Sequence, residues 1–258
     1  MNAKSIADLG PPLMFGLLVL AFWEGVVRLA GVPAVILPAP SAIAFRIVHS
    51  LPILGLDWLQ TARGMLAGYL IGNAAGLIVA VLIDRSPFLQ RGLLPLGNLV
   101  SALPIVGVAP IMVMWFGFDW QSKAAVVVAM TFFPMLVNAT AGLAAAGPME
   151  RDLMKTYAAG YAQTLRMLRL PAAAPFVFNA LKINTTLAMI GAIVAEFFGT
   201  PTVGMGFRIS TEVGHLSIDM VWATIVVAAL TGSAFYGAVA LIERRVSFWH
   251  ASYRIREN

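Results

Sequence analysis

Two carboxylates in this sequence could do chemistry, because both stand inside long hydrophobic runs. Glu24 lies in the first run and Glu196 near the end of the fifth, in "VAEFFGT". A carboxylate in apolar surroundings is costly and usually binds an ion, relays a proton or pairs with a base. Arg28 stands four residues after Glu24, which predicts an ion pair along one helix face. Glu196 has no local partner, so Arg63 and Lys182 are its candidate distant partners.

Motifs for catalysis and metal binding are absent from the sequence. There is no G-x-x-x-x-G-K-[ST] phosphate loop, no H-E-x-x-H zinc motif and no G-x-S-x-G nucleophile elbow. There is no cysteine, and His49, His215 and His250 are far apart. We therefore expect no metal site and no cofactor on this chain, and no intramembrane enzyme.

The composition indicates an all-α integral membrane protein. Of 258 residues, 60% are hydrophobic and 11% are charged, and the mean hydropathy is +0.85. Soluble domains carry about 25% charged residues. The net charge of +5 fits cytoplasmic loops, which collect lysine and arginine, better than nucleic-acid binding.

Six membrane spans are predicted, because about 20 apolar residues cross a bilayer as a helix. They lie at about 12–31, 57–83, 92–115, 122–146, 176–198 and 221–243. The first reads as a retained span and not as a cleaved signal peptide. With the N-terminus inside, eleven basic residues fall on the inner side and five on the outer side. This distribution predicts that both termini are cytoplasmic.

These spans divide the chain into three parts. Residues 1–56 hold the N-terminal span and a periplasmic amphipathic segment. Residues 57–243 form the core, which includes a cytoplasmic insert at 147–175. Residues 244–258 are a cytoplasmic tail.

The second span carries a stripe of small residues. Gly64, Gly68, Gly72 and Gly76 recur every four residues and so share one helix face. Such stripes let two helix backbones approach closely. The stripe could pack within the subunit, which we favour, or could form a contact between subunits.

The third span is interrupted by Pro95, Pro104 and Pro110. Broken backbone inside a membrane is tolerated where protein or a water-filled cavity satisfies it. This segment is therefore either a transport pathway or a kinked packing helix. The candidate pathway residues, two of them from the fifth span, are Leu103, Pro104, Val106, Pro110, Met114, Asn184 and Ile193.

The insert predicts an amphipathic helix on the inner membrane face. Pro148 and Glu150 suit a first helical turn. Gly160 offers a bend, and Leu170–Pro171 is expected to end the second piece. Its mixed charge favours a protein partner over anionic lipid. The positions of its stripe recur about every four residues, at Leu153, Tyr157, Tyr161, Leu165 and either Leu168 or Arg169.

Four stretches together resemble one family. They are "LPAPSAI" (37–43), "ALPIVGVAPIMVMWFGF" (102–118), "FFPMLVNATAGL" (132–143) and "AEFFGTPTVGMGFRI" (195–209). The chain resembles the permease subunits of bacterial ABC importers, in the nitrate/sulfonate/taurine-type branch. The resemblance implies the type I importer permease fold and a place in the bacterial inner membrane.

In that family the cytoplasmic insert carries an E-A-A…G…L-P motif, which forms coupling helices that dock on an ATPase subunit. Aligned on Leu170–Pro171, the motif glutamate falls on Asp152 and its glycine on Ala158, so the glycine is not kept and Gly160 is expected to provide the bend. The resemblance implies the ATPase-coupling residues Asp152, Leu153, Met154, Tyr157, Ala158, Gly160, Leu165, Leu168 and Pro171.

The resemblance also implies partners. These are a second permease copy in a homodimer, two ATPase subunits that carry ATP and Mg²⁺, and a periplasmic or lipid-anchored binding protein. Glu196, with Arg63, is expected to have a gating or structural role and not to bind substrate: the carboxylate could cap the Gly204–Gly206 loop or pair with a base such as Arg63.

The substrate is left open between a small heterocycle and a small oxyanion such as nitrate or a sulfonate. The scarcity of basic residues in mid-span slightly favours the heterocycle. A secondary transporter or channel driven by an ion gradient is the alternative function, and it would need ion sites built from Glu24 and Glu196.

Overall fold

The computed structural model describes residues 3–86, 88–92, 104–199 and 202–247, and every regular element in these ranges is helical. The elements are α1 (Ala3–Leu29), α2 (Pro40–His49), α3 (Leu51–Arg85), α5 (Ile105–Phe116), α6 (Trp120–Ala144), α7 (Pro148–Thr156), α8 (Tyr161–Thr164), the π-helical turn η1 (Leu165–Arg169), α9 (Leu170–Gly199), α10 (Met205–Gly214) and α11 (Ile218–Val246).

Five helical segments of the described chain are long and apolar enough to cross a membrane, which confirms a multi-pass protein. They are Gly10–Leu29, α3, α6, Tyr161–Gly199 and α11. Of the predicted span at 92–115, the structure describes Gly92 and the residues from Pro104 on. There, α5 has 12 residues, about 18 Å of helix, which is shorter than a bilayer core of about 30 Å. Pro95 and Leu103 lie outside the described residues.

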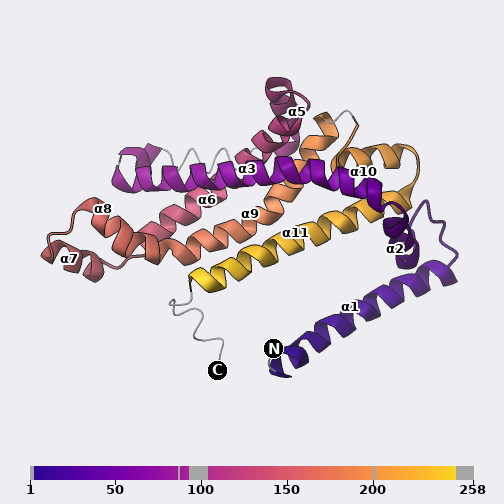
Figure 1. The fold of residues 1–258 in the computed structure, drawn as a ribbon, viewed down its shortest axis with the longest axis horizontal. Helices are drawn as coiled ribbons and strands as arrows, with labels where there is room; N and C mark the ends of the chain where they lie inside the picture. The colour runs from indigo at the N-terminus through magenta and orange to yellow at the C-terminus, as the bar shows by residue number, and fades with distance from the viewer. Residues whose placement is uncertain (1–2, 87, 93–103, 200–201, 248–258) are drawn as a thin grey trace.

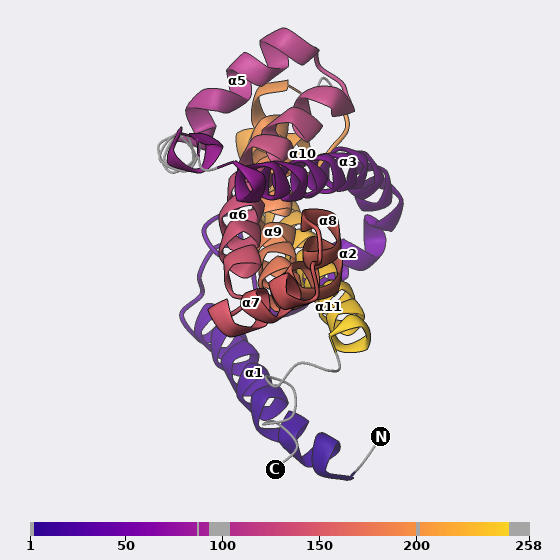
Figure 2. The same cartoon turned by 90° about the vertical axis from the view of Figure 1, so that its left-hand side faces the viewer.

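The long helices form one elongated bundle, with α5 projecting from its side and the other short helices at its two ends (Figures 1 and 2). Helices α3, α6, α9 and α11 run along the long axis (Figure 1). Helices α7 and α8 lie at one end, together with the end of α11, and α2 and α10 lie at the other. Helix α1 stands apart from the bundle in both views (Figures 1 and 2), and only 6% of its apolar window is buried.

The glycine stripe of α3 packs inside the chain, against α6. A Cβ atom added at Gly68 would lie 2.5 Å from Val127 Cβ and 2.6 Å from the Ala124 carbonyl oxygen. At Gly76 it would lie 2.6 Å from the Phe132 carbonyl oxygen. The two helix backbones are therefore as close as small residues allow, and the prediction of packing within the subunit is confirmed.

Glu24 is used locally, as its spacing to Arg28 predicts. Arg28 Nε lies 2.5 Å from Glu24 Oε1. The Ser41 amide donates to Glu24 Oε2 at 3.0 Å, and the Ser41 hydroxyl donates to Oε1 at 2.7 Å. Glu24 therefore ties the first turn of α2 to α1. Because both oxygens of the Glu24 carboxylate are used in these contacts, this residue is not free to bind an ion.

The chain does not end its helix at Leu170–Pro171, contrary to expectation. It passes through the π-helical turn η1 directly into α9, so one helical stretch runs from Tyr161 to Gly199. Pro171 cannot donate to the carbonyl four residues back. The Leu170 amide bonds to Leu165 O, five residues back, so the widened turn lets the helix continue past the proline.

Candidate functional site

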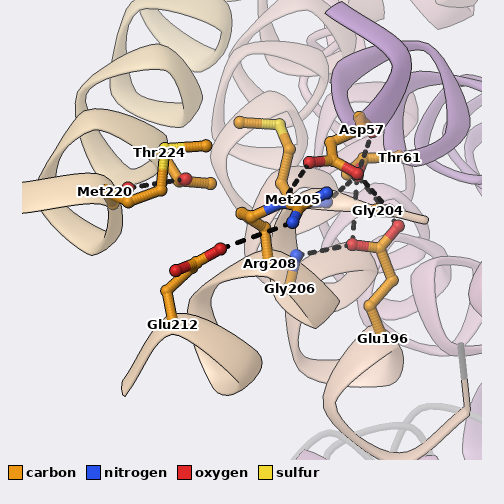
Figure 3. A network of polar contacts seen from close by, with 10 residues as sticks. All are labelled: Asp57, Thr61, Glu196, Gly204, Met205, Gly206, Arg208, Glu212, Met220 and Thr224. Atoms are coloured by element: carbon orange, nitrogen blue, oxygen red, sulfur yellow. Dashed lines mark hydrogen bonds and ion pairs between the residues drawn. The ribbon is translucent and has the colours of Figure 1, made fainter. Parts of the chain in front are cut away.

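The end of the bundle that holds α10 contains a buried polar cluster, which Figure 3 shows at close range. Helix α10 begins after Gly204, whose φ of +141° is open only to glycine without strain. The first amides of a helix have no partner within it. Here other helices supply the acceptors.

Three side chains from two helices accept these amides. The Gly204 amide donates to Asp57 Oδ1 at 2.9 Å, and the Met205 amide donates to Thr61 Oγ1 at 2.9 Å. The Gly206 amide donates to Glu196 Oε2 at 2.7 Å. Asp57 and Thr61 come from α3 and Glu196 from α9, so the start of α10 is tied to two of the central helices.

The cluster is closed by further contacts. The Thr61 hydroxyl lies 2.8 Å from Glu196 Oε1, to which it donates. Arg208 of α10 lies 2.8 Å from Asp57 Oδ2 and 3.4 Å from Glu212. The hydrogen bond to Asp57 raises the pKa of Arg208 above its usual value, so this arginine stays charged. Asp57 and Glu196 are 1% and 2% exposed.

The sequence interpretation missed α10, Asp57 and Thr61. A signal was available, because positions 57, 61, 64 and 68 fall on one face of α3. Polar residues that extend a glycine stripe face a neighbouring backbone and not lipid.

The expected basic partners of Glu196 are elsewhere. Lys182 pairs with Glu243 of α11 at 2.7 Å, which corrects its proposed role. Arg63 is exposed, and its pairing with Glu196 is not among the ion pairs of the described residues. Lys123 donates instead to the carbonyls of Phe118 and Gly199, where it caps the end of α9.

At the opposite end, the insert folds into α7 and a second short piece. Helix α7 ends in a left-handed turn at Ala158, whose φ is +51°. The Ala159 amide donates to Met154 O at 3.0 Å and the Ala158 amide to Lys155 O at 2.9 Å. This pair of bonds is a Schellman motif.

The bend therefore lies at Ala158 and not at Gly160, which corrects the expectation. Gly160 precedes α8 with φ −69°, and a Cβ there would meet nothing within 4 Å. Ala158 holds the position on which the family motif places glycine, and its left-handed backbone is one that glycine adopts without strain.

Replacing Ala158 with glycine is expected to stabilise α7. A left-handed alanine costs about 1 kcal/mol, which glycine does not incur. The change should slow hydrogen exchange of the α7 amides about fivefold, as measured by mass spectrometry. Ala162→Gly, within α8, is the control and should not slow exchange. Equal or faster exchange in Ala158→Gly would contradict the left-handed turn.

One face of α7 is an exposed apolar ridge, formed by Met149, Leu153 and Tyr157. Their exposed fractions are 82%, 55% and 77%. On the opposite face, the exposed Asp152 pairs with Lys155 at 2.8 Å. That hydrogen bond lowers the pKa of Asp152. Met154 is half-buried.

The second piece of the insert faces the bundle. The Tyr161 hydroxyl donates to Asp84 Oδ2 at 3.1 Å, and Arg169 pairs with the same carboxylate. Leu165 packs against the core cluster that contains Ile83 and Leu136. Tyr161 and Leu165 therefore attach the insert to α3 and do not continue the ridge, although the sequence interpretation placed them on one stripe. Leu168 and Pro171 are half-buried.

The two predicted pathway segments lie side by side. Ala109 of α5 is buried with Val126 and Ala195 in one cluster. A Cβ added at Gly199 would lie 2.8 Å from Val113 Cγ1. Four predicted pathway residues, described in α5 or at its start, are exposed: Pro104, Val106, Pro110 and Met114.

Asn184 is fully buried and takes part in a polar network. Its Nδ2 donates to Asn73 Oδ1 at 2.6 Å and to Thr131 O at 2.8 Å. It therefore joins α9 to α3 and α6, and it is not among the residues that line the described cavities.

Ile193, in contrast, lines a cavity between α9 and α11 with a volume of about 600 Å³. The lining residues with polar side chains are Thr186, Ser233 and Tyr236. The described residues that line it include no charged side chain. This size is within the range of small-molecule sites.

Comparisons with known proteins agree with this arrangement. Residues 72–248 match the family described as binding-protein-dependent transport system inner membrane component. The riboflavin transport system permease protein RibX of Chloroflexus aurantiacus is 31% identical over 250 residues, which cover 95% of this chain and 91% of RibX.

Two further relatives and one structure are similar. The formylaminopyrimidine transport permease protein ThiX of Halalkalibacterium halodurans is 29% identical, covering 92% of this chain and 95% of ThiX. The putative aliphatic sulfonates transport permease protein SsuC of Bacillus subtilis is 27% identical, covering 93% and 88%. A crystal structure of an amino acid ABC transporter with histidines matches with a TM-score of 0.63 and 16% identity, covering 78% of this chain and 97% of that one.

Proposed function

This chain belongs to the family of binding-protein-dependent transport system inner membrane components and is the permease subunit of an ABC importer, and from that premise we propose how its two ends work. The family assignment decides against the ion-gradient alternative. Glu24 and Glu196, which such a transporter would need, are both occupied by hydrogen bonds.

The exposed ridge of α7 is the docking surface for a separate ATPase subunit that carries ATP and Mg²⁺. Three apolar side chains in line on a helix suit insertion into an apolar groove. The segment after α7 is bonded to α3, because Tyr161 and Arg169 both contact the Asp84 carboxylate. A displacement of α7 is therefore transmitted to the central helices.

We place the insert and both termini on the cytoplasmic side of the inner membrane. The clustering of lysine and arginine supports this, as does the position of the end of α11, which points toward the same end of the bundle as α7 and α8 (Figure 1). A second permease copy, two ATPases and a substrate-binding protein complete the importer, and two permease halves rock around a central path.

At the outer end, the α10 cluster turns the movement of α3 and α9 into movement of α10. The start of α10 is bonded to Asp57 and Thr61 on one helix and to Glu196 on another. If the two helices shift relative to each other, these bonds cannot all persist, so α10 is released or moved. This is the gating role proposed for Glu196.

Glu196→Gln is therefore expected to lower the maximal transport rate without changing substrate preference. Glutamine has the same size, but its amide nitrogen cannot accept from the Gly206 amide or the Thr61 hydroxyl. Hydrogen bonds to a charged group contribute about 1.5–3 kcal/mol. Uptake by proteoliposomes, compared with the control Glu212→Gln, measures the effect. A changed selectivity with the rate preserved would make Glu196 a specificity residue.

The transported substrate is a small, flat, uncharged heterocycle. The observation that carries this proposal is the uncharged cavity between α9 and α11, with its hydroxyls and Tyr236. A nitrate or sulfonate would be expected to meet a cationic group there. Relatives named for riboflavin and formylaminopyrimidine transport support the same class.

Uptake measurements distinguish a heterocycle substrate from an oxyanion substrate. With the cognate binding protein and ATPase, uptake of riboflavin or of a pyrimidine is expected to be saturable. Ile193→Trp, which fills the cavity, is expected to block that uptake. Ile225→Val, which leaves the cavity open, is the control. Saturable uptake of nitrate or a sulfonate, with no uptake of either heterocycle, would reject the proposal.

A further inference from the structure

A polar cleft separates α7 from the following piece of the insert, on the side opposite the apolar ridge. Its volume is about 350 Å³. Helices α7 and α8, on either side of it, face the viewer in Figure 2. The lining residues are Pro148, Arg151, Asp152, Lys155, Ala159, Tyr161, Thr164 and Arg169.

The cleft holds more positive than negative charge. Arg151, Lys155 and Arg169 line it, and Asp152 is the acid among its lining residues. Asp152 pairs with Lys155 and Asp84 pairs with Arg169. Among the residues that the structure describes, Arg151 has no carboxylate partner, and its Nε makes a long bond of 3.3 Å to Gly147 O. The half-buried charge of Arg151 is therefore not held in an ion pair, and it acts on the Asp152 carboxylate only at longer range.

A second observation points the same way. Arg169 Nε is buried and has no hydrogen-bond partner among the described residues. A buried donor without an acceptor is unfavourable. Two arginines in one cleft, one without an ion pair and one with an unused donor, favour an anion with several acceptor oxygens. Guanidinium groups suit phosphate in particular, because their fixed donors match its oxygens.

We propose that this cleft binds a phosphate-class anion, either the headgroup of an anionic phospholipid or a free phosphate. Arg151 belongs to α7, and Arg169 to the turn that leads into α9. A bound anion would join the two and hold α7 at a set angle to the bundle. The proposal concerns this face alone and does not depend on what docks on the ridge.

The test uses the purified full-length chain in phosphatidylcholine nanodiscs, with inorganic phosphate titrated against chloride at constant ionic strength. Thermal unfolding is expected to shift upward until the site is saturated. Arg151→Gln should raise the phosphate concentration at the midpoint of the titration about tenfold, as expected for losing a charged hydrogen-bond donor. Arg166→Gln is the matched control, because Arg166 is exposed in the same segment and is not among the lining residues.

A second arm separates the two sources. In this arm the nanodiscs contain phosphatidylglycerol and no phosphate is added at first. The ligand is the lipid headgroup if these nanodiscs stabilise the wild type but do not stabilise Arg151→Gln, and if phosphate added afterwards has no further effect. Stabilisation by phosphate but not by phosphatidylglycerol identifies a free anion. The proposal is overturned if neither raises the unfolding temperature, or if Arg151→Gln responds to both as the wild type does.

Discussion

Replacing Gly68 with alanine is expected to cause the largest loss of stability of any single change discussed. The added Cβ would lie 2.5 Å from Val127 Cβ and 2.6 Å from the Ala124 carbonyl oxygen. Neither atom is the end of a flexible side chain, so α3 and α6 must move apart along their whole contact. Overpacking of a tight interior costs about 1–3 kcal/mol or more, and we expect the upper end.

The measurement is the yield of monodisperse protein on size exclusion, followed by thermal unfolding. The matched control is Gly237→Ala on α11, where a Cβ would meet nothing within 4 Å. There, alanine should stabilise the helix by about 1 kcal/mol. A Gly68→Ala protein that unfolds at the wild-type temperature would show that α3 and α6 do not pack as described.

Replacing Tyr157 with aspartate is expected to have the largest effect on transport with the fold intact. Tyr157 is 77% exposed and ends the apolar ridge of α7, so a charge there does not disturb the permease itself. In the docked complex the carboxylate would be buried without a partner. Loss of an interface aromatic commonly costs about 2 kcal/mol or more, which is about thirtyfold in affinity.

Co-purification of the ATPase and ATP-dependent uptake in proteoliposomes measure this loss. Tyr157→Phe should retain both, and Gln163→Asp, exposed on α8 outside the ridge, should do so as well. Leu165→Asp should instead lower the stability of the isolated permease, because Leu165 packs on the core. If Tyr157→Asp retains the ATPase and full uptake, the ridge is not the docking surface.

Much of this arrangement could be predicted from the sequence, because it depends on local patterns. Hydrophobic runs of sufficient length predict membrane helices whatever their neighbours are. The four-residue spacing of Glu24 and Arg28 predicts their ion pair, and the spacing of Gly64 to Gly76 predicts a face for close packing. The combination of motifs pointed to the ABC importer permeases, which the comparisons confirm.

The partners of the buried polar groups were decided by the tertiary structure. Glu196 was expected either to cap the Gly204–Gly206 loop or to pair with a basic residue, and it accepts from the Gly206 amide of that loop and from the Thr61 hydroxyl. Lys182, a candidate for that pair, lies beside Glu243 instead. The sequence alone does not show which helix ends lie next to each other in the fold. A backbone amide at the start of a helix can stabilise a buried carboxylate such as Glu196, as a basic side chain would.

The insert shows the same division within a few residues. Its amphipathic period was evident from the sequence and placed Leu153 and Tyr157 on one face, and in the structure both are exposed. The left-handed turn at Ala158 rotates the next piece, so that Tyr161 and Leu165 face α3 and not the solvent. A periodic pattern holds only while the helix is continuous. Where the backbone turns, the packing of the following residues decides which side chains remain free to bind a partner.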